Sequence, residues 1–339
     1  MVPPTPLTSL LSHPTNNTPI ILDGALATYL ETLGADITTS LWSAQLLSTN
    51  PSLIRKAHRD YFLAGANVAI TASYQASFPG LMQNLDWSAI PGAETREQRE
   101  AYAKTLIRTS VEQARAARDE VCGMDAFVAG RDVEAVERTL LVAGSVGPYG
   151  AFLADGSEYR GDYVVGKEEM KEFHRTRIQV LVDSGADILA CETIPSFAEA
   201  EALVELLREE FPAQEAWFSF TLRDGGSISD GTGLEEVVRL LEGCDKVVAV
   251  GVNCVPEDTG LAALETLKGL TKKPLVMYPN SGEQWNAQAR DWEGHRTEGK
   301  QLADRAREWH SAGARLIGGC CRTTPKDIEV IMKALVDAP

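Results

Sequence analysis

The sequence predicts an α/β fold, a single (β/α)8 barrel of the TIM type, from three observations. Eight short apolar segments alternate along the chain with segments that carry helix signals. The apolar segments are apolar on both faces, as parallel strands buried under helices should be. A helix end, a glycine and a short link lead into a strand at residues 64–67, 184–187 and 312–315, and this repeated joint indicates repeated βα units.

A helix follows each strand in the predicted order of elements. The expected strands span residues 20–22, 68–72, 140–144, 188–191, 217–220, 247–252, 275–278 and 316–317. The expected helices span residues 26–33, 51–64, 96–121, 167–182, 197 onward, 234–241, 260–270, 300–310 and 325 onward. Eight such units fit a closed barrel. An open doubly wound sheet is the alternative, but no Gly-x-Gly-x-x-Gly motif follows the first strand.

Three helix starts carry recognisable capping residues. Asn50 and Thr324 each stand directly before a proline, which favours a capped first turn. Ser196 and Glu199 have the spacing of a capping box, in which each side chain bonds the other residue's backbone. These signals fix where three of the eight outer helices should begin.

The chain is expected to hold one domain. Residues 1–18 contain four prolines and no Lys or Arg, so they resemble neither a strand nor a signal peptide and are predicted to be a flexible N-terminal tail. Residues 19–339 form the predicted barrel domain. Residues 122–138 look like an insertion before the third strand, at the bottom of the barrel, and we assign them no function.

The composition excludes several classes of partner. The chain has 339 residues, of which 44% are hydrophobic and 24% charged, as in ordinary globular proteins. With 48 acidic against 32 basic residues, the net charge of −16 argues against nucleic acid or an anionic membrane as partner. This charge is compatible with a cationic substrate, although solubility is the simpler interpretation. The sequence does not fix the oligomeric state.

The six cysteines are expected to be free thiols or metal ligands. A chain of this size can bury its own core without disulfides, and it has no recognisable signal peptide. We therefore expect a reducing compartment and predict a cytoplasmic protein.

Three cysteines point to a metal site. The last predicted strand leads through two glycines to Cys320 and Cys321, and a disulfide between adjacent cysteines would be strained. Cys254 follows the sixth strand, so a barrel brings all three thiols to the rim where strands end and active sites lie. A sulfur-rich set suits Zn²⁺, and three protein ligands leave one position open, as in catalytic sites. A closed structural site is the alternative, with Cys191 as a fourth ligand; Cys191 could equally be a free thiol.

The ligand set indicates a class of chemistry. Three thiolates leave zinc with a net negative charge, which makes it a poor Lewis acid toward a carbonyl group. Such a site is better suited to hold a substrate thiol as its thiolate, because coordination lowers the thiol pKa. The natural reaction partner of this nucleophile is an alkyl group on a cation, so the site predicts thiol alkylation.

Two carboxylates stand at the same rim. Asp23 and Glu192 end the first and fourth strands and could bind the ammonium group of an amino acid substrate. The backbone amides that follow, at Gly24 and Ala25, open a helix and could bind its carboxylate. For Asp23 the alternative is an N-cap of that helix.

At this point the sequence resembles a known family. The segments 21–25, 251–254 and 318–321 look like the zinc-dependent homocysteine S-methyltransferases, over residues 18 to 335. The resemblance implies a barrel in which Cys254, Cys320 and Cys321 bind zinc and act in catalysis. It also implies that homocysteine occupies the open position, with Asp23 and Glu192 at its amino group and Asn253 close by.

The resemblance also implies a methyl donor. Residues 71–77, which include Ser73 and Tyr74, and residues 278–283 are similar to the branch that uses S-methylmethionine, often with S-adenosylmethionine as a second donor. The C-terminal extension of the betaine-using branch and the cobalamin domains of large methionine synthases are not expected. The implied reaction is one direct methyl transfer that gives methionine, a step of methionine biosynthesis. Whether it supplies methionine or recycles S-adenosylmethionine stays open.

Aromatic side chains are candidates to face a cationic donor. These are Tyr74, Tyr149, Trp285 and Trp292, and for each of them packing in the core or in a lid is the alternative. The polar loop 281–299 could close over the site. Two other functions remain open, the same chemistry with betaine or selenocysteine, and a non-enzymatic zinc-buffering or thiol-redox barrel.

Overall fold

All eight predicted strands are present in the computed structural model, which describes residues 6–11, 18–38, 41–122, 140–286 and 291–336. The barrel strands are β1 (Ile20–Ile21), β2 (Val68–Ile70), β3 (Leu141–Val146), β4 (Ile188–Ile194), β5 (Ala216–Phe220), β8 (Val247–Asn253), β9 (Leu275–Tyr278) and β12 (Ala314–Ile317). Every pair of neighbours among them is parallel.

The sheet closes into a barrel. Strands β1 and β12, the first and last, are paired, and the sheet runs from β12 through β9, β8, β5, β4 and β3 to β2. A parallel bridge between Leu22 and Val68 joins the two remaining edges. Closure confirms the predicted TIM barrel and rules out the open doubly wound sheet.

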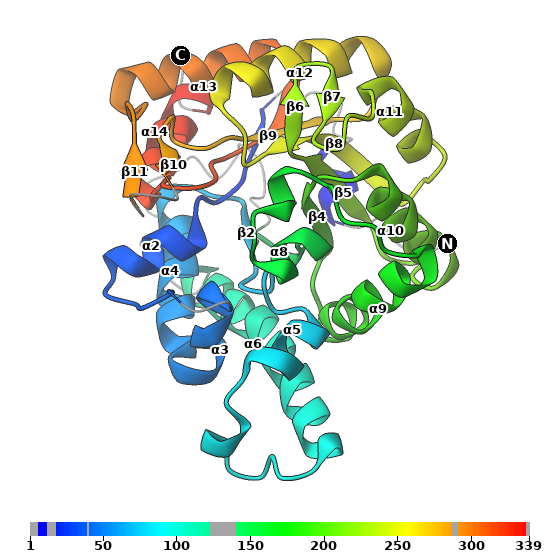
Figure 1. The fold of residues 1–339 in the computed structure, drawn as a ribbon. Coiled ribbons are helices and arrows are strands. Elements are labelled where there is room, and N and C mark those ends of the chain that lie inside the picture. Colours follow the sequence, from blue (N-terminus) through cyan, green and yellow to red (C-terminus); the bar gives the residue numbers. More distant parts are fainter. Residues whose placement is uncertain (1–5, 12–17, 39–40, 123–139, 287–290, 337–339) are drawn as a thin grey trace.

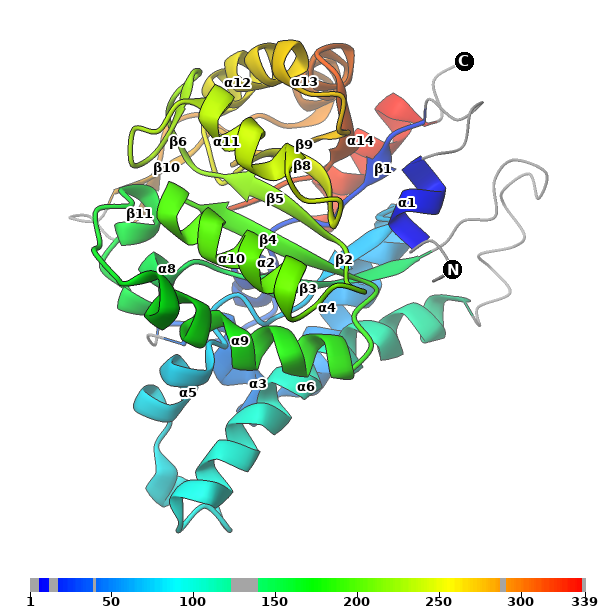
Figure 2. The same cartoon turned by 90° about the vertical axis from the view of Figure 1, so that its right-hand side faces the viewer.

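A helix covers each strand on the outside, as Figures 1 and 2 show. These helices are α4 (Pro51–Ala64), α6 (Arg96–Cys122), α9 (Lys167–Asp183), α10 (Phe197–Glu209), α11 (Leu234–Glu242), α12 (Glu257–Leu270), α13 (Gly299–Ser311) and α14 (Pro325–Leu335). Shorter helices precede α4 or lie in the loops that follow strands: α1 (Pro6–Leu11), α2 (Leu26–Thr32), η1 (Trp42–Gln45), α3 (Leu46–Thr49), α5 (Phe78–Asn84), η2 (Trp87–Ala89), α8 (Tyr149–Leu153) and η3 (Ser157–Tyr159). No helix of the described part is long and apolar enough to cross a membrane.

The repeated helix-to-strand joint has the predicted geometry. Gly65, Gly185 and Gly313 have φ angles of 114°, 82° and 110°, in the left-handed region that residues with a Cβ avoid. Each glycine ends an outer helix and turns the chain into the next strand. The recurring sequence pattern therefore forms the turns that lead from an outer helix to the next strand, at the bottom of the barrel.

One part of the predicted tail is ordered, which corrects the prediction of a loose segment. Residues 6–11 form α1, and Leu7 is buried with apolar residues of the barrel interior. Thr8 Oγ1 donates a 2.5 Å hydrogen bond to Glu215, which precedes β5. Figure 2 shows α1 at one end of the barrel, opposite α8, β10 and β11. Of the predicted insertion 122–138, only Cys122 lies within the described residues, as the exposed last residue of α6.

The barrel interior is filled by side chains. Large apolar groups from alternate strand positions meet there, among them Trp217, Tyr278 and Leu141. Trp217 Nε1 lies 3.2 Å from Tyr278 Oη, so the two largest side chains are linked in the centre. With the interior closed, any substrate must bind at a rim.

Two hairpins at the rim were not predicted. One pairs β6 (Leu222–Asp224) with β7 (Ser227–Ile228), and the other pairs β10 (Gln284–Asn286) with β11 (Asp291–Glu293). The second lies within the polar loop 281–299, so part of that loop has regular structure.

Candidate active site

The three predicted metal ligands lie together. Cys254 directly follows β8, and Cys320 and Cys321 follow β12; only β9 separates these strands. The three sulfur atoms are within 4.8 Å of one another, and we call them the thiol cluster. The Sγ atoms of Cys254 and Cys321 are 3.6 Å apart, and all three cysteines are free. Two sulfurs that share a tetrahedral zinc ion, each about 2.3 Å from it, would be roughly 3.8 Å apart, so the cluster fits one ion.

The backbone around the thiol cluster is strained. Cys254, Thr193 and Arg322 have φ angles of 55°, 60° and 69°, although none is a glycine. Such conformations cost about 1–3 kcal/mol each and occur where the surroundings enforce them. Hydrogen bonds hold the ligand loops: Cys254 N donates to Tyr278 O at 3.2 Å and Cys320 N to Pro279 O at 2.7 Å.

The two glycines before the cysteines are required by close packing. A Cβ atom on Gly318 would lie 2.7 Å from the carbonyl oxygen of Asp23, and one on Gly319 would lie 2.4 Å from Thr323 Oγ1. Gly319 N also donates to Asp23 O at 3.2 Å. The Gly-Gly pair thus lets the cysteine loop pass against the end of β1.

Asp23 is buried at the end of β1, and its carboxylate accepts a hydrogen bond of 2.9 Å from Ile70 N. Burial, reinforced by the nearby Glu192, holds its pKa well above the usual range. Helix α2 is preceded by Ala25 and has no side-chain cap, so the alternative of Asp23 as an N-cap is wrong. The amide of Ala25 already donates to Thr323 Oγ1 at 3.1 Å, which leaves Gly24 as the predicted amide for a substrate carboxylate.

Glu192 lies inside the mouth of the barrel. It accepts hydrogen bonds from Ser145 Oγ and, at 3.1 Å, from Tyr278 Oη. Burial raises its pKa to about 7, against the opposing effect of these two hydrogen bonds. Asp23 and Glu192 are therefore two neighbouring buried acids with no basic side chain bonded to either one in the described structure.

Two further predicted residues have their polar groups bonded within the protein. Asn253 is fully buried; its Oδ1 accepts from Thr193 N at 2.7 Å and its Nδ2 donates to Thr193 Oγ1 at 2.8 Å. It thus fixes the strained turn that follows Glu192. Ser73 Oγ donates to Ser145 O at 2.8 Å. Direct contact of Asn253 or Ser73 with a substrate stays a prediction.

Cys191 does not belong to the thiol cluster. Along β4, Ala190 packs in the barrel interior, whereas Cys191 packs in the layer between strands and helices. Burial there raises the pKa of its thiol. Because side chains alternate along a strand, Glu192 points inward and Cys191 outward, so Cys191 is not the fourth ligand.

Two residues at the site were missed from the sequence. They are Glu158 and Tyr159 of η3, in the loop after β3. Tyr159 Oη lies 3.4 Å from Cys254 Sγ, and the nearby thiols raise the tyrosine pKa. Glu158 is buried, which raises its pKa to about 7, and the charge of Cys254 adds to this effect. Both residues lie more than ten positions beyond the strand end, so strand-end reasoning could not place them.

The candidate aromatic residues fall into three groups. Burial raises the pKa of Tyr74, and the charges of Glu158 and Cys254 add to this effect. Tyr74 is therefore close enough to the thiol cluster for these charges to act on it. Tyr149 instead packs its ring against Phe152, Tyr163 and Phe173, at centroid distances of 5.5, 5.5 and 4.9 Å. For Tyr149 the structure therefore shows core packing.

Trp285 and Trp292 are opposite each other in the β10–β11 hairpin. Their contact with a donor stays a prediction.

Comparison with known proteins decides the family. A family model described as homocysteine S-methyltransferase matches residues 20–335. The chain belongs to the homocysteine S-methyltransferase family. It is 53% identical to a homocysteine S-methyltransferase of Escherichia coli (strain K12) over 313 residues, which cover 92% of this chain and 94% of that relative.

Further relatives support the same family. The selenocysteine methyltransferase of Astragalus bisulcatus is 42% identical over 322 residues, which cover 93% of this chain and 92% of that relative. The crystal structure of the homocysteine methyltransferase MmuM from E. coli in its metallated form superposes with a TM-score of 0.79 at 50% identity, covering 96% of this chain and 98% of that one. The predicted family, methyltransferase activity and barrel are confirmed.

A second buried polar cluster lies beside the family site, and it corrects the predicted capping box at Ser196. Glu199 does not cap α10; its carboxylate accepts from Tyr149 N at 2.7 Å, Tyr163 Oη and His174 Nε2 at 2.7 Å. His174 Nδ1 faces Arg177 at 2.9 Å, and because arginine only donates, Nδ1 accepts and Nε2 carries the proton. We call Glu199, His174, Arg177 and Tyr163 the ion network.

The ion network supports two loops of the site. Arg177 is fully buried and donates to the carbonyl oxygens of Tyr74 at 2.9 Å and Gly147 at 2.5 Å. These carbonyls belong to the loops after β2 and β3. The network thus joins the loop of Tyr74 to the loop that leads to Glu158.

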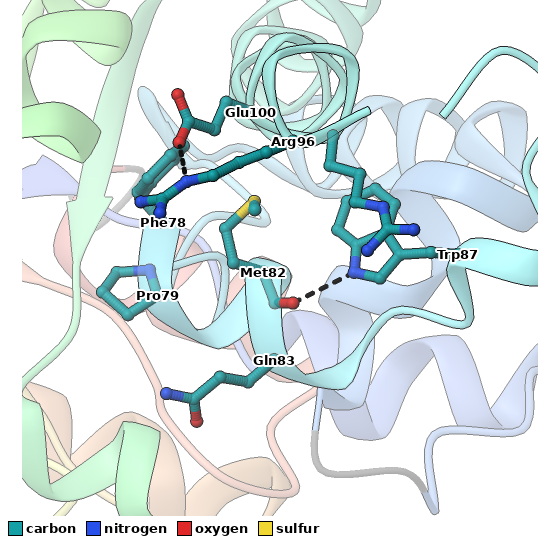
Figure 3. A pocket seen from close by; sticks show the side chains of 8 residues that line it. Phe78, Pro79, Met82, Gln83, Trp87, Arg96 and Glu100 are labelled. Carbon is teal, nitrogen blue, oxygen red and sulfur yellow. Dashed lines mark hydrogen bonds and ion pairs between the residues drawn. The ribbon is translucent and has the colours of Figure 1, made fainter. Parts of the chain in front are cut away.

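A groove of about 480 Å³ lies apart from these residues, between α5, η2 and α6 (Figure 3). Its lining includes Phe78, Met82 and Trp87. Figure 3 marks two hydrogen bonds there, from Trp87 Nε1 to Met82 O at 3.0 Å and from Arg96 to Glu100 at 2.8 Å. The groove contains no thiol and offers no chemistry of its own.

Proposed function

We propose that this enzyme transfers a methyl group from a sulfonium donor to the thiolate of L-homocysteine and so forms methionine, with zinc held by Cys254, Cys320 and Cys321. The observation that carries the proposal is the thiol cluster, three free thiols within 4.8 Å at the rim of the barrel. Bound zinc would lower the pKa of the substrate thiol and keep it a nucleophilic thiolate at neutral pH. The cluster offers three ligands, so one position remains for the substrate sulfur.

The remaining groups orient homocysteine. Asp23 and Glu192 are buried acids at the ends of β1 and β4, and neither forms an ion pair within the described residues. The substrate ammonium would supply this cation. The amide of Gly24 is the proposed partner of the substrate carboxylate. With both ends of the amino acid held, its thiol is directed to the cluster, and such positioning supplies much of the rate.

The proposed donor is S-methylmethionine, with S-adenosylmethionine as a second one. A sulfonium and a thiolate become two neutral sulfur compounds in one displacement, which a site shielded from water favours. Tyr74 is the proposed aromatic contact of the donor cation, because it lies beside Glu158 and Cys254.

Selenocysteine is a second candidate acceptor. The observation that favours it is the 42% identity to a relative named selenocysteine methyltransferase. A selenol ionises more readily than a thiol and is an equally soft ligand, so the same site would accept it. Competition between homocysteine and selenocysteine for one donor measures which acceptor the site prefers.

An assay of methionine formation tests the proposal. Purified enzyme is supplied with homocysteine and, in separate reactions, S-methylmethionine, S-adenosylmethionine or betaine. We expect turnover with the two sulfonium donors, loss of turnover with a chelator and recovery with added zinc. Turnover that survives complete metal removal, or turnover with betaine alone, would contradict the proposal. A cytoplasmic location remains part of the proposal.

A further inference from the structure

Glu158 has an unpaired carboxylate oxygen in the interior. The residue is 6% exposed, and its Oε2 atom has no hydrogen-bond partner in the described structure. A buried carboxylate without a partner is strongly unfavourable, and such groups in native proteins need an explanation. The carbonyl oxygen of Glu158 accepts a 3.0 Å bond from Thr221, so the loop that carries it is fixed.

The surroundings of Glu158 are acidic. Its charge acts on Cys254 and Cys321, and it also raises the pKa of Tyr74. The neighbouring Arg160 is half exposed and pairs instead with Asp162 at 3.0 Å and Asp155 at 3.7 Å. No basic side chain of the described structure forms an ion pair with Glu158. Burial and the nearby thiols therefore disfavour the charged form of Glu158, and Arg160 offsets this only in part. A cation that enters from outside would stabilise the carboxylate.

The other two acids of the site differ from Glu158. Asp23 and Glu192 lie at strand ends and already accept hydrogen bonds from the barrel wall. Glu158 lies in the loop after β3, next to the tyrosine that contacts Cys254. In Figure 1, α8 of this loop lies in front of the barrel strands near β4. A ligand that reaches the thiol cluster from the loop side would meet Glu158.

We propose that Glu158 binds the sulfonium group of the methyl donor and thereby selects cationic donors over neutral ones. This inference rests on the proposed function. The donor must bring its sulfur close to the thiol cluster for the methyl to reach homocysteine, and this is the region where the charge of Glu158 acts. The sulfonium supplies the missing positive charge.

The role of Glu158 has a kinetic signature. As the methyl group leaves, the donor sulfur loses its positive charge, so the carboxylate stabilises the bound donor more than the transition state. Such an interaction lowers KM without raising kcat. Glu158 should therefore lower the KM of the donor. The kcat of the wild type should equal the kcat of a variant without this charge or lie slightly below it.

The test compares Glu158→Gln with wild type at saturating homocysteine. The matched control is Asp162→Asn, an exposed acid of the same loop. Two probes are used: S-methylmethionine as donor, and 2-amino-5-methylhexanoate, which has the same shape but CH in place of the sulfonium, as inhibitor. We expect Glu158→Gln to raise the KM of S-methylmethionine about tenfold to hundredfold, with kcat maintained and inhibition by the neutral analogue within about twofold.

Each other outcome overturns the inference. Equal weakening of both probes would mean that Glu158 binds the ammonium group they share. An unchanged donor KM would mean that Glu158 has only a structural role. In both cases the wild type would still form methionine, so the proposed function would stand; a wild type that forms none refutes the proposed function itself.

Discussion

The molecule contains two buried polar clusters side by side, and they are built in opposite ways. In the ion network both oxygens of Glu199 and both ring nitrogens of His174 have partners. At the thiol cluster, three sulfurs lie within 4.8 Å of one another, and the charge of Cys254 acts on the buried acids Glu192 and Glu158. One cluster neutralises itself, whereas the other gathers groups of like charge.

The difference shows which cluster serves stability and which serves binding. In the ion network only Nε of Arg177 lacks a hydrogen-bond partner in the described structure. A buried network in which nearly all polar atoms are bonded fixes the fold, because removing one member leaves the others unpaired. A cluster of acidic groups is costly until cations bind, and the cations that we propose are a metal ion, an ammonium and a sulfonium. Changes in the thiol cluster should therefore affect activity, and changes in the ion network should affect stability.

The largest effect is expected for Cys254→Ser. Loss of one of three metal ligands should reduce methionine formation by about 10³-fold and lower the bound metal, while the fold is kept. Metal analysis, the methionine assay and thermal denaturation measure these three quantities. Cys191→Ala is the matched control, since that thiol faces the helices; it should keep both metal and turnover. A Cys254→Ser enzyme with full metal and full activity would remove the distinction between the clusters.

The second effect is expected for Arg177→Met. Removing the buried guanidinium leaves Glu199 and the carbonyl of Gly147 without their cation, and the free energy of unfolding should fall by about 3 kcal/mol. Urea denaturation measures this change. Arg175→Met on the same helix removes an exposed ion pair with Glu210 and should cost less than about 1 kcal/mol. Equal losses for the two variants would show that the network does not fix the fold.

A third effect concerns pH. The pKa of Glu192 is raised to about 7 in the folded protein, whereas an unfolded glutamate has a value near 4.3, so the folded state binds the extra proton between these values. Stability from this group is present at low pH and is lost as pH rises through about 7. We compare wild type with Glu192→Gln, both reduced and metal-free. Raising the pH from 5 to 8 should lower the free energy of unfolding of wild type by an amount on the order of 2 kcal/mol more than that of the variant. If the stability of the two proteins in urea denaturation changed equally with pH, the raised pKa of Glu192 would be contradicted.

The smallest effect is expected at the groove. Arg99 lies over the ring of Trp87 at 5.7 Å and donates to Ala93 O at 3.0 Å. Arg99→Ala should cost about 0.5–1 kcal/mol of stability and leave the kinetic constants for both substrates within about twofold. A large rise in either KM would show that the groove takes part in binding, and that the site extends well beyond the rim.

The sequence predicted the barrel and the clustering of the three cysteines, for physical reasons. Strand and helix signals are local. The glycine that recurs at three helix-to-strand turns indicates a backbone conformation that only glycine adopts readily. Cys254 directly follows a strand, and Cys320 and Cys321 follow another after two glycines; in a closed barrel all strand ends meet at one rim. Topology therefore brings them together without knowledge of any loop.

Side chains carried by loops could not be placed in the same way. Glu158 and Tyr159 reach the site through a loop whose path depends on distant contacts such as the bond to Thr221. Glu199 has the spacing of a capping box, yet its carboxylate accepts hydrogen bonds from residues distant in the sequence. Cys191 stands at the rim in sequence, but alternation along β4 turns it outward. Local patterns fix the backbone, and tertiary contacts decide where polar side chains point.

The central claim is that the thiol cluster holds zinc with one position left for the sulfur of homocysteine. X-ray absorption at the zinc edge counts the sulfur ligands directly, before and after homocysteine is added. The account predicts three sulfurs and one lighter ligand in the free enzyme, and four sulfurs once homocysteine has bound. Four sulfurs in the free enzyme, or a count that homocysteine leaves unchanged, would contradict it.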